Sequence, residues 1–301
     1  MQAQSQKSIR KILFHTRFRE HAFQALESLL ELRKVGLTEV VLTHIVPTEE
    51  VSFVPYGGYL KEQADRFVEE ARLRFEDWSH QLSDSGIRFR YRIDIGQPNA
   101  RILAIAEEEQ VDWIVTGRKK RTLLEMVYVG SHLLDILRRS DRPVLMHKYI
   151  VECKEGCEAK IRVNERIFAR PLITTDWSEP CLHARDELPR FAGLIEKVHI
   201  VHVMDEKTTN GRNREMLLQM EAENRGKLET WQKWFGEQGI QSETHLSAGK
   251  ATSEILRMSH DYDATLIVMG RTGKDWMDEY WLGGVSHRVA EKAELPVLIV
   301  P

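Results

Sequence analysis

The residues best suited to chemistry form two glycine-rich turns, separated by nine residues, near the end of the chain. The first, Met269-Gly270-Arg271-Thr272-Gly273, follows an apolar run, and the second, Gly283-Gly284-Val285-Ser286, opens an amphipathic segment. A glycine after a buried strand lets the backbone approach a ligand, and Gly273 can continue the turn with positive φ. Amides at a helix start favour phosphate, to which Ser286 can add a hydroxyl. The spacing indicates a phosphate-binding loop, although two ordinary glycine turns would give the same pattern.

A carboxylate directly follows the first apolar run of the second half, at the edge of the sheet where the glycine loop is also expected. The apolar run Pro171–Thr175 is followed at once by Asp176, and then by Ser178 and Pro180. An aspartate at this point can cap the next helix. It can equally accept hydrogen bonds from an adenine amino group or a ribose, the usual use of an acid at the carboxyl edge of a sheet. Both roles for Asp176 stay open at this stage.

The elements that must position these residues alternate short apolar runs with longer amphipathic ones. In the second half the pattern predicts strands at 171–175, 198–204, 244–247, 266–269 and 297–300, and helices at 180–193, 215–238, 253–260 and 285–293. Continuously apolar strands separated by helices indicate a parallel sheet covered on both faces. Such sheets bind ligands outside the carboxyl ends of their strands, so functional residues should lie near Thr175, Met204 and Gly270.

The chain repeats itself at an offset of 153 residues. Five anchors, Gly96, Ile102, Gly117, Gly130 and Pro143, fall on Gly249, Ile255, Gly270, Gly283 and Pro296. Near the start of each half the offset is 158 or 159, which places His44 on His202; we expect both to be hydrogen-bonded core residues. Length agrees, since 301 residues suit two domains of about 150. We assign 1–148 and 168–301 to the two copies and the charged segment 149–167 to a linker.

Composition narrows the function classes. The chain is 42% hydrophobic and 30% charged with a formal net charge of -3, so it is expected to be globular and without an overall basic field for nucleic acid or membrane lipid. The basic run Arg118–Arg121 is interpreted as a solvated turn, the alternative being a site for another phosphorylated ligand or a nucleic acid phosphate. Neither a signal peptide nor a membrane span is apparent, which predicts a cytoplasmic protein. Cys153 and Cys157, with His147 nearby, are too few for a typical zinc knuckle.

Taken together, these residues resemble the universal stress protein family. The resemblance rests on Thr175-Asp176-x-Ser178, on Ile267-Val268-Met269-Gly270-x-x-Gly273 and on Gly283-Gly284-Val285-Ser286 nine residues later, with Pro296–Val300 closing the domain. It covers nearly all of the second half and, more faintly, the first. It implies an α/β fold class with two tandem open doubly wound, Rossmann-like domains, each built on a mainly five-stranded parallel sheet.

The nucleotide-binding branch of that family holds ATP through a G-x2-G-x9-G-[ST] loop. The resemblance thus implies ATP as the cofactor, Asp176 as a contact to adenosine that could also hold Mg2+, and Val203 as lining of the adenine pocket. The site so implied comprises Thr175, Asp176, Val203, Met269, Gly270, Arg271, Gly273, Gly283, Gly284, Val285 and Ser286. One position departs from the family: Gly284 replaces a Ser or Thr, and loss of that hydroxyl should weaken ATP binding about tenfold.

The first half departs further from the loop. Lys120 occupies the second glycine position, Leu133 replaces the final hydroxyl residue, and Arg17 stands about where Asp176 stands in the second half. Loss of the carboxylate and of one glycine predicts that this copy does not bind ATP in the family manner.

The sequence favours a binding protein over an enzyme. It contains neither a P-loop, a kinase motif set, a nucleophile elbow nor a zinc-protease motif, which leaves at most slow ATPase or autophosphorylation activity. We therefore expect a stress-response or signalling protein that binds an adenine nucleotide in its second domain. The alternative is an interaction scaffold without nucleotide. The resemblance further implies that the two domains form an intramolecular pseudo-dimer through their last strands. Val144–Met146 and Val297–Val300 are the candidate edges, since apolar edges need covering. Further homodimerisation is left open.

Overall fold

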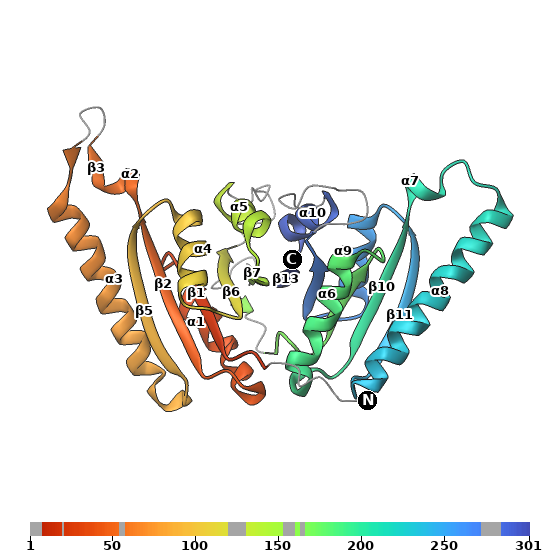
Figure 1. Ribbon diagram of the computed structural model, residues 1–301, viewed down its shortest axis with the longest axis horizontal. Helices are drawn as coiled ribbons and strands as arrows, with labels where there is room; N and C mark the ends of the chain where they lie inside the picture. Colours follow the sequence, from red (N-terminus) through yellow and green to blue (C-terminus); the bar gives the residue numbers. More distant parts are fainter. Residues whose placement is uncertain are drawn as a thin grey trace.

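The computed structural model shows a V-shaped arrangement of two similar halves (Figure 1). It describes residues 8–19, 21–53, 58–119, 131–152, 160–162, 166–271 and 284–301.

The second half is a five-stranded parallel sheet. Its strands are β9 (Pro171–Thr175), β10 (Val198–Asp205), β11 (Ser242–Gly249), β12 (Leu266–Gly270) and β13 (Val297–Val300), in the spatial order β11-β10-β9-β12-β13. The main helices are α6 (Glu179–Glu187), α8 (Arg214–Glu237), α9 (Ala251–Asp261) and α10 (Gly284–Lys292), with the short α7 (Glu206–Thr209). All five expected strands are present, and β11 extends beyond the expected 244–247.

One expected helix is broken. The segment 180–193 forms α6 and then a 3-10 helix, η3 (Leu188–Leu194), inside which Phe191 has non-helical dihedral angles. Pro189 explains the break, because proline has no N–H to donate and its ring clashes with the preceding turn of an α-helix.

The first half repeats the same order of strands. These are β1 (Lys11–His15), β2 (Glu39–Pro47), β5 (Arg88–Gly96), β6 (Trp113–Lys119) and β7 (Val144–Glu152), arranged β5-β2-β1-β6-β7. Its helices are α1 (Ala22–Ser28), η1 (Leu30–Val35), α2 (Thr48–Val51), α3 (Lys61–Gln81), η2 (Ser83–Ser85), α4 (Pro98–Glu108) and α5 (Ser131–Arg139). Two short strands, β3 (Ser52–Phe53) and β4 (Gly58–Tyr59), pair outside the main sheet.

The last strands of the two halves pair with each other, as the sequence predicts. β13 runs antiparallel to β7, with Val297 opposite Met146 and Ile299 opposite Val144. The two sheets thereby join into one continuous sheet (Figure 1), which has 11 strands when β8 (Lys160–Arg162), paired with β7, is included. Each strand covers the apolar edge of the other.

The segment assigned to a linker contains strand residues of β7 and β8. β7 continues to Glu152, and β8 (Lys160–Arg162) pairs antiparallel with it. Ile167 and Phe168, at the end of the segment, are fully buried. Cys153 and Cys157 lie outside the described residues.

Hydrophobic side chains cover both faces of the sheet, as a doubly wound fold requires. One core packs residues of α1, α3, α6 and α8 against the sheet, and the other packs residues of α4, α5, α9 and α10 against the opposite face. Both cores contain residues from the two halves. Within the described residues, every helix is too short or too polar to cross a membrane.

Candidate functional site

The candidate site lies where the strand order of the second half reverses. The chain moves outward from β9 to β10 and β11 on one side and to β12 and β13 on the other, so β9 and β12 flank the switch point. In open parallel sheets this is where a crevice forms beyond the carboxyl ends of the strands. Asp176 directly follows β9 and Arg271 directly follows β12. The fold thus positions these two predicted residues at neighbouring strand ends.

Asp176 is half-buried and holds the start of α6. Its Oδ1 accepts a hydrogen bond from the Ser178 amide at 3.0 Å and one from the Cys181 thiol at 3.2 Å. Burial raises the pKa of Cys181 to about 11, and the neighbouring Asp176 charge adds to the effect. The thiol therefore stays protonated and donates to the carboxylate. Asp176 does not cap α6, because Ser178 is the N-cap residue and no side chain makes a cap hydrogen bond; Asp176 instead binds the amide of Ser178. The carboxylate retains capacity for further donors.

Gly270 is required by packing inside the protein. A Cβ placed there would lie 2.7 Å from the Pro180 carbonyl carbon and 2.9 Å from the Cys181 nitrogen. The sequence interpretation, that this glycine lets the backbone approach a ligand, therefore has a competing explanation in the close approach of α6. Ser286 Oγ also donates to the Gly270 carbonyl at 2.9 Å, which ties the first turn of α10 to the end of β12.

Arg271 reaches across to the first half. Its Nη1 donates to the carbonyls of Arg138 at 3.2 Å and Ser140 at 2.7 Å, at the C-terminal end of α5. In return Lys148, on β7, donates from Nζ to the carbonyls of Ala290 at 2.8 Å and Ala293 at 2.6 Å, at the end of α10. Each cation thus caps the negative end of a helix in the other half. We call this pair of contacts the cross-caps.

The remaining described residues of the predicted site surround this edge. Thr175 is buried; its Oγ1 accepts from the Trp177 amide at 3.0 Å and its carbonyl accepts from His202 Nδ1 at 2.7 Å. His202 is therefore a hydrogen-bonded core residue, as predicted. Val203, Met269 and Val285 belong to the core on the α9 and α10 side.

The outer part of the predicted loop falls partly outside the described residues. Gly284 begins α10 and is exposed. Gly273 and Gly283 lie outside the described residues, as do Lys120 and Arg121 in the first half. The structure thus brings together Thr175, Asp176, Gly270 and Ser286.

Sequence reasoning did not identify the cross-caps or the polar junction of the two halves. In that junction Arg190 bridges Glu187 and Asp112, both at 2.6 Å, and Glu187 accepts from the Trp113 indole at 2.5 Å. Burial raises the pKa of Glu187, while Arg190 opposes that effect. In every contact between the halves, the two partners lie 74 or more residues apart in the sequence. Neither helical spacing nor strand alternation could therefore indicate them.

Comparison with known proteins agrees with this architecture. Residues 8–148 and 170–301 each match the universal stress protein family. The chain is 29% identical over 153 residues to universal stress protein MJ0577 of Methanocaldococcus jannaschii, covering 46% of this chain and 94% of that protein. It is 30% identical over 146 residues to MJ0531 of the same organism, covering 46% of this chain and 86% of that protein.

A solved structure matches the whole arrangement. The crystal structure of a universal stress protein from Archaeoglobus fulgidus aligns with a TM-score of 0.72 and 21% identity over 97% of this chain and 96% of that one. The fold therefore extends through both halves. The chain belongs to the universal stress protein family and carries two copies of its domain in tandem.

Proposed function

We propose that the second half binds ATP, or a related adenine nucleotide, at the carboxyl edge of β9 and β12. In this proposal the protein works in the cytoplasm in a stress response or signalling role. The first half serves as a structural or regulatory partner that keeps the fold without the site. The segments 1–148 and 168–301 are the two functional units, joined by 149–167.

The observation that carries the proposal is a convergence of three segments in the second half. Asp176, the end of β12 and the first turn of α10 meet at the switch point, with Ser286 Oγ 2.9 Å from the Gly270 carbonyl. At the matching positions the first half has Arg17 and a partly buried Leu133. Arg17 offers no acceptor for adenosine where Asp176 stands, and Leu133 offers no hydroxyl for phosphate where Ser286 stands.

The described contacts refine what each residue would do. Because the Ser286 hydroxyl already donates to Gly270, the phosphate oxygens would be held by backbone amides of 283–286. Asp176 would accept from the adenine amino group or the ribose, or hold Mg2+ beside the phosphates. Val203 would line the adenine pocket. Gly270, Arg271 and Gly273 would supply the turn beneath the ribose.

Binding rather than turnover is the expected activity. The one described thiol, Cys181, is buried and has a pKa of about 11, so it is a poor nucleophile at neutral pH. Asp176 is committed to the start of α6. We therefore expect ATP hydrolysis or autophosphorylation to be slow.

Calorimetric titration of the whole protein with ATP and Mg2+ tests the proposal. The wild type should bind one ATP per chain, and Asp176→Asn should weaken binding at least tenfold, because the charge goes while an acceptor for the Ser178 amide remains. The matched control is Arg17→Asn at the corresponding position of the first half, which should bind as the wild type does. Gly273→Lys, which copies Lys120, should abolish binding.

Two further measurements serve as controls for the titration. Thermal unfolding of each variant separates lost binding from lost folding, and mass spectrometry of denatured protein shows whether nucleotide copurifies. Absence of binding heat from the wild type, together with absence of copurified nucleotide, would refute the proposal.

An interaction scaffold is the alternative that one observation favours. Asp176, Arg271 and Ser286 all make contacts inside the protein that need no ligand. If the scaffold reading holds, Arg271→Met weakens the junction of the halves and leaves ATP without effect on thermal stability. Stabilisation by ATP in the wild type would exclude the scaffold reading.

A further inference from the structure

A second polar cluster lies at the opposite edge of the same half. His199 is near the amino end of β10, and β11 pairs with it in parallel so that Glu243 stands beside His199 and His245 beside Val201. His199 is buried, His245 is half-buried and Glu243 is exposed. The cluster therefore opens to solvent on one side and is far from the carboxyl edge proposed to bind nucleotide.

We infer that His199, His245 and Glu243 form a binding site for one divalent transition-metal ion such as Zn2+. The ligand atoms of the three side chains all lie within 4.8 Å of one another. The His199 Nδ1 and the His245 Nε2 are 3.0 Å apart. Two nitrogens bound to one tetrahedral Zn2+, each at about 2.0 to 2.1 Å, are roughly 3.3 Å apart, so only a small shift is needed.

The rings are held in orientation by a third aromatic side chain. Tyr262, which ends α9, stacks on His245 with ring centroids 3.8 Å apart and on His199 at 5.3 Å. The two imidazoles share a hydrogen bond, so one ring donates to the other. Metal binding moves that proton to the far nitrogen of the same ring, which frees both facing lone pairs without net proton release. Such an arrangement needs little ordering when the metal arrives.

Electrostatics keep the ligands in the forms that bind metal. Burial lowers the pKa of His199 to about 4, helped by His245, and burial also lowers the pKa of His245. Both rings are therefore neutral at pH 7. The hydrogen bond from Lys197 lowers the pKa of Glu243, which stays ionised. Arg170 and Lys197 are the nearby cations that oppose a metal ion; Lys197 lies 3.2 Å from Glu243 in an exposed ion pair and can swing away.

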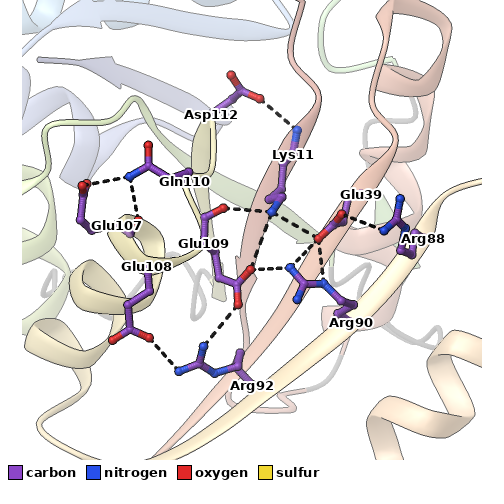
Figure 2. A network of polar contacts seen from close by, with 10 residues as sticks. All are labelled: Lys11, Glu39, Arg88, Arg90, Arg92, Glu107, Glu108, Glu109, Gln110 and Asp112. Carbon is purple, nitrogen blue, oxygen red and sulfur yellow. Dashed lines mark hydrogen bonds and ion pairs between the residues drawn. The ribbon is translucent and has the colours of Figure 1, made fainter.

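The first half shows that the fold itself does not require histidines here. Gly96 and Gly249 close β5 and β11 opposite Pro47 and Asp205, which places Arg90 and Arg92 where Glu243 and His245 stand. Figure 2 shows the ion-pair network that fills this place: Arg90 contacts Glu39 and Glu109, and Arg92 contacts Glu108 and Glu109. Glu109 ends α4 as Tyr262 ends α9. Only the second half has metal-binding side chains at these positions.

Titration of the chelator-treated, full-length protein with ZnCl2 tests the site. We expect one Zn2+ per chain at this cluster, with affinity reduced at least tenfold by His245→Gln and by Glu243→Gln. The matched control is His260→Gln, because its side chain is 93% exposed on α9 outside the cluster. Lys197→Met should bind Zn2+ several-fold more tightly, since it removes the competing ammonium. A gain of affinity cannot result from misfolding.

Cobalt substitution separates this site from the cysteines. Co2+ held by nitrogen and oxygen gives weak visible bands, whereas thiolate ligands add a strong charge-transfer band in the near ultraviolet. We expect the first spectrum, lost in His245→Gln and kept in His260→Gln, and a rise in thermal midpoint with Zn2+ that follows the same pattern. The inference fails if the wild type binds no Zn2+, or if His245→Gln binds it as the wild type does.

Discussion

The two halves have the same cluster of side chains at the carboxyl end of their first strand, and we call this cluster the corner. In the first half Phe18 packs on His44 and Trp78 with Arg74 over its ring, and in the second half Trp177 packs on His202 and Trp231 with Lys227 over its ring. Both histidines donate from Nδ1 to the carbonyl of a threonine, Thr16 or Thr175. Phe18 and Trp177 both have positive φ. The corner belongs to the duplicated scaffold, so it does not decide which half binds a ligand.

The two halves differ at the residue that precedes Phe18 or Trp177, which is Arg17 in the first half and Asp176 in the second. Asp176 lies just before α6, which starts at Glu179, and binds the Ser178 amide. The first turn of α6, at Pro180 and Cys181, packs against Gly270. In the first half Arg17 stands in that place and α1 starts only at Ala22. Gly117, the counterpart of Gly270, has no atom of the described residues within 4 Å of a built Cβ. A shared corner thus supports a closely packed edge in one half and a looser edge in the other.

Substitution of the two glycines should give the largest contrast. Gly270→Ala should lower the free energy of unfolding by about 3 kcal/mol, because the new methyl group meets backbone atoms that cannot move aside. Gly117→Ala should leave it unchanged or raise it by up to about 1 kcal/mol, since the unfolded chain loses freedom. Chemical denaturation of both variants measures the difference. Equal effects would contradict the contrast between the edges.

The cross-caps predict a smaller contrast between the halves. Lys148→Met should cost about 2 kcal/mol of unfolding free energy, because it removes two charge-assisted hydrogen bonds from a buried site at the end of α10. Arg271→Met should cost less, since the Arg271 side chain is only half-buried. Denaturation curves of the two variants and of the double variant test this order. A larger loss in Arg271→Met would reverse it.

The sequence predicted the features that recur locally and missed those that depend on register across the sheet. Glycine and proline spacing revealed the duplication, and apolar runs located all five strands of the second half. The pairing of β7 with β13 was expected from the family resemblance, with the apolar last strands as the candidate edges. By contrast, Lys148 contacts α10 across the junction of the two halves, 145 residues along the chain, and His199 meets His245 only through strand register. Single-residue patterns carry no signal for such contacts.

Acid should destabilise the fold in part through a histidine that only the first half has. Burial lowers the pKa of His15 to about 3, with His44 and Arg17 adding to the effect; Thr174 is its counterpart. Below pH 6.5 His15 becomes protonated in the unfolded chain but stays neutral in the folded protein down to about pH 3. Unfolding free energy therefore falls by up to about 1.4 kcal/mol per pH unit from 6.5 to 3 on account of His15. His15→Thr should remove this share of the slope between pH 6 and 5, measured by denaturation at each pH.

The smallest effect concerns the one residue where the first half keeps the family loop better than the second. Ser131 matches Gly284, so Gly284→Ser gives the second half the hydroxyl that the first half has. A Cβ at Gly284 would lie 3.4 Å from the end of the flexible Arg288 side chain, an ordinary contact that the helix tolerates. We expect ATP binding to tighten by about 1.4 kcal/mol, close to tenfold, by calorimetry. Gly284→Ala separates the hydroxyl from the loss of backbone freedom, because it changes only the latter. If both variants bind ATP equally, the first turn of α10 does not contact phosphate through this position. The asymmetry between the halves would then rest on the contrasts of Asp176 with Arg17, of Gly273 with Lys120 and of Ser286 with Leu133.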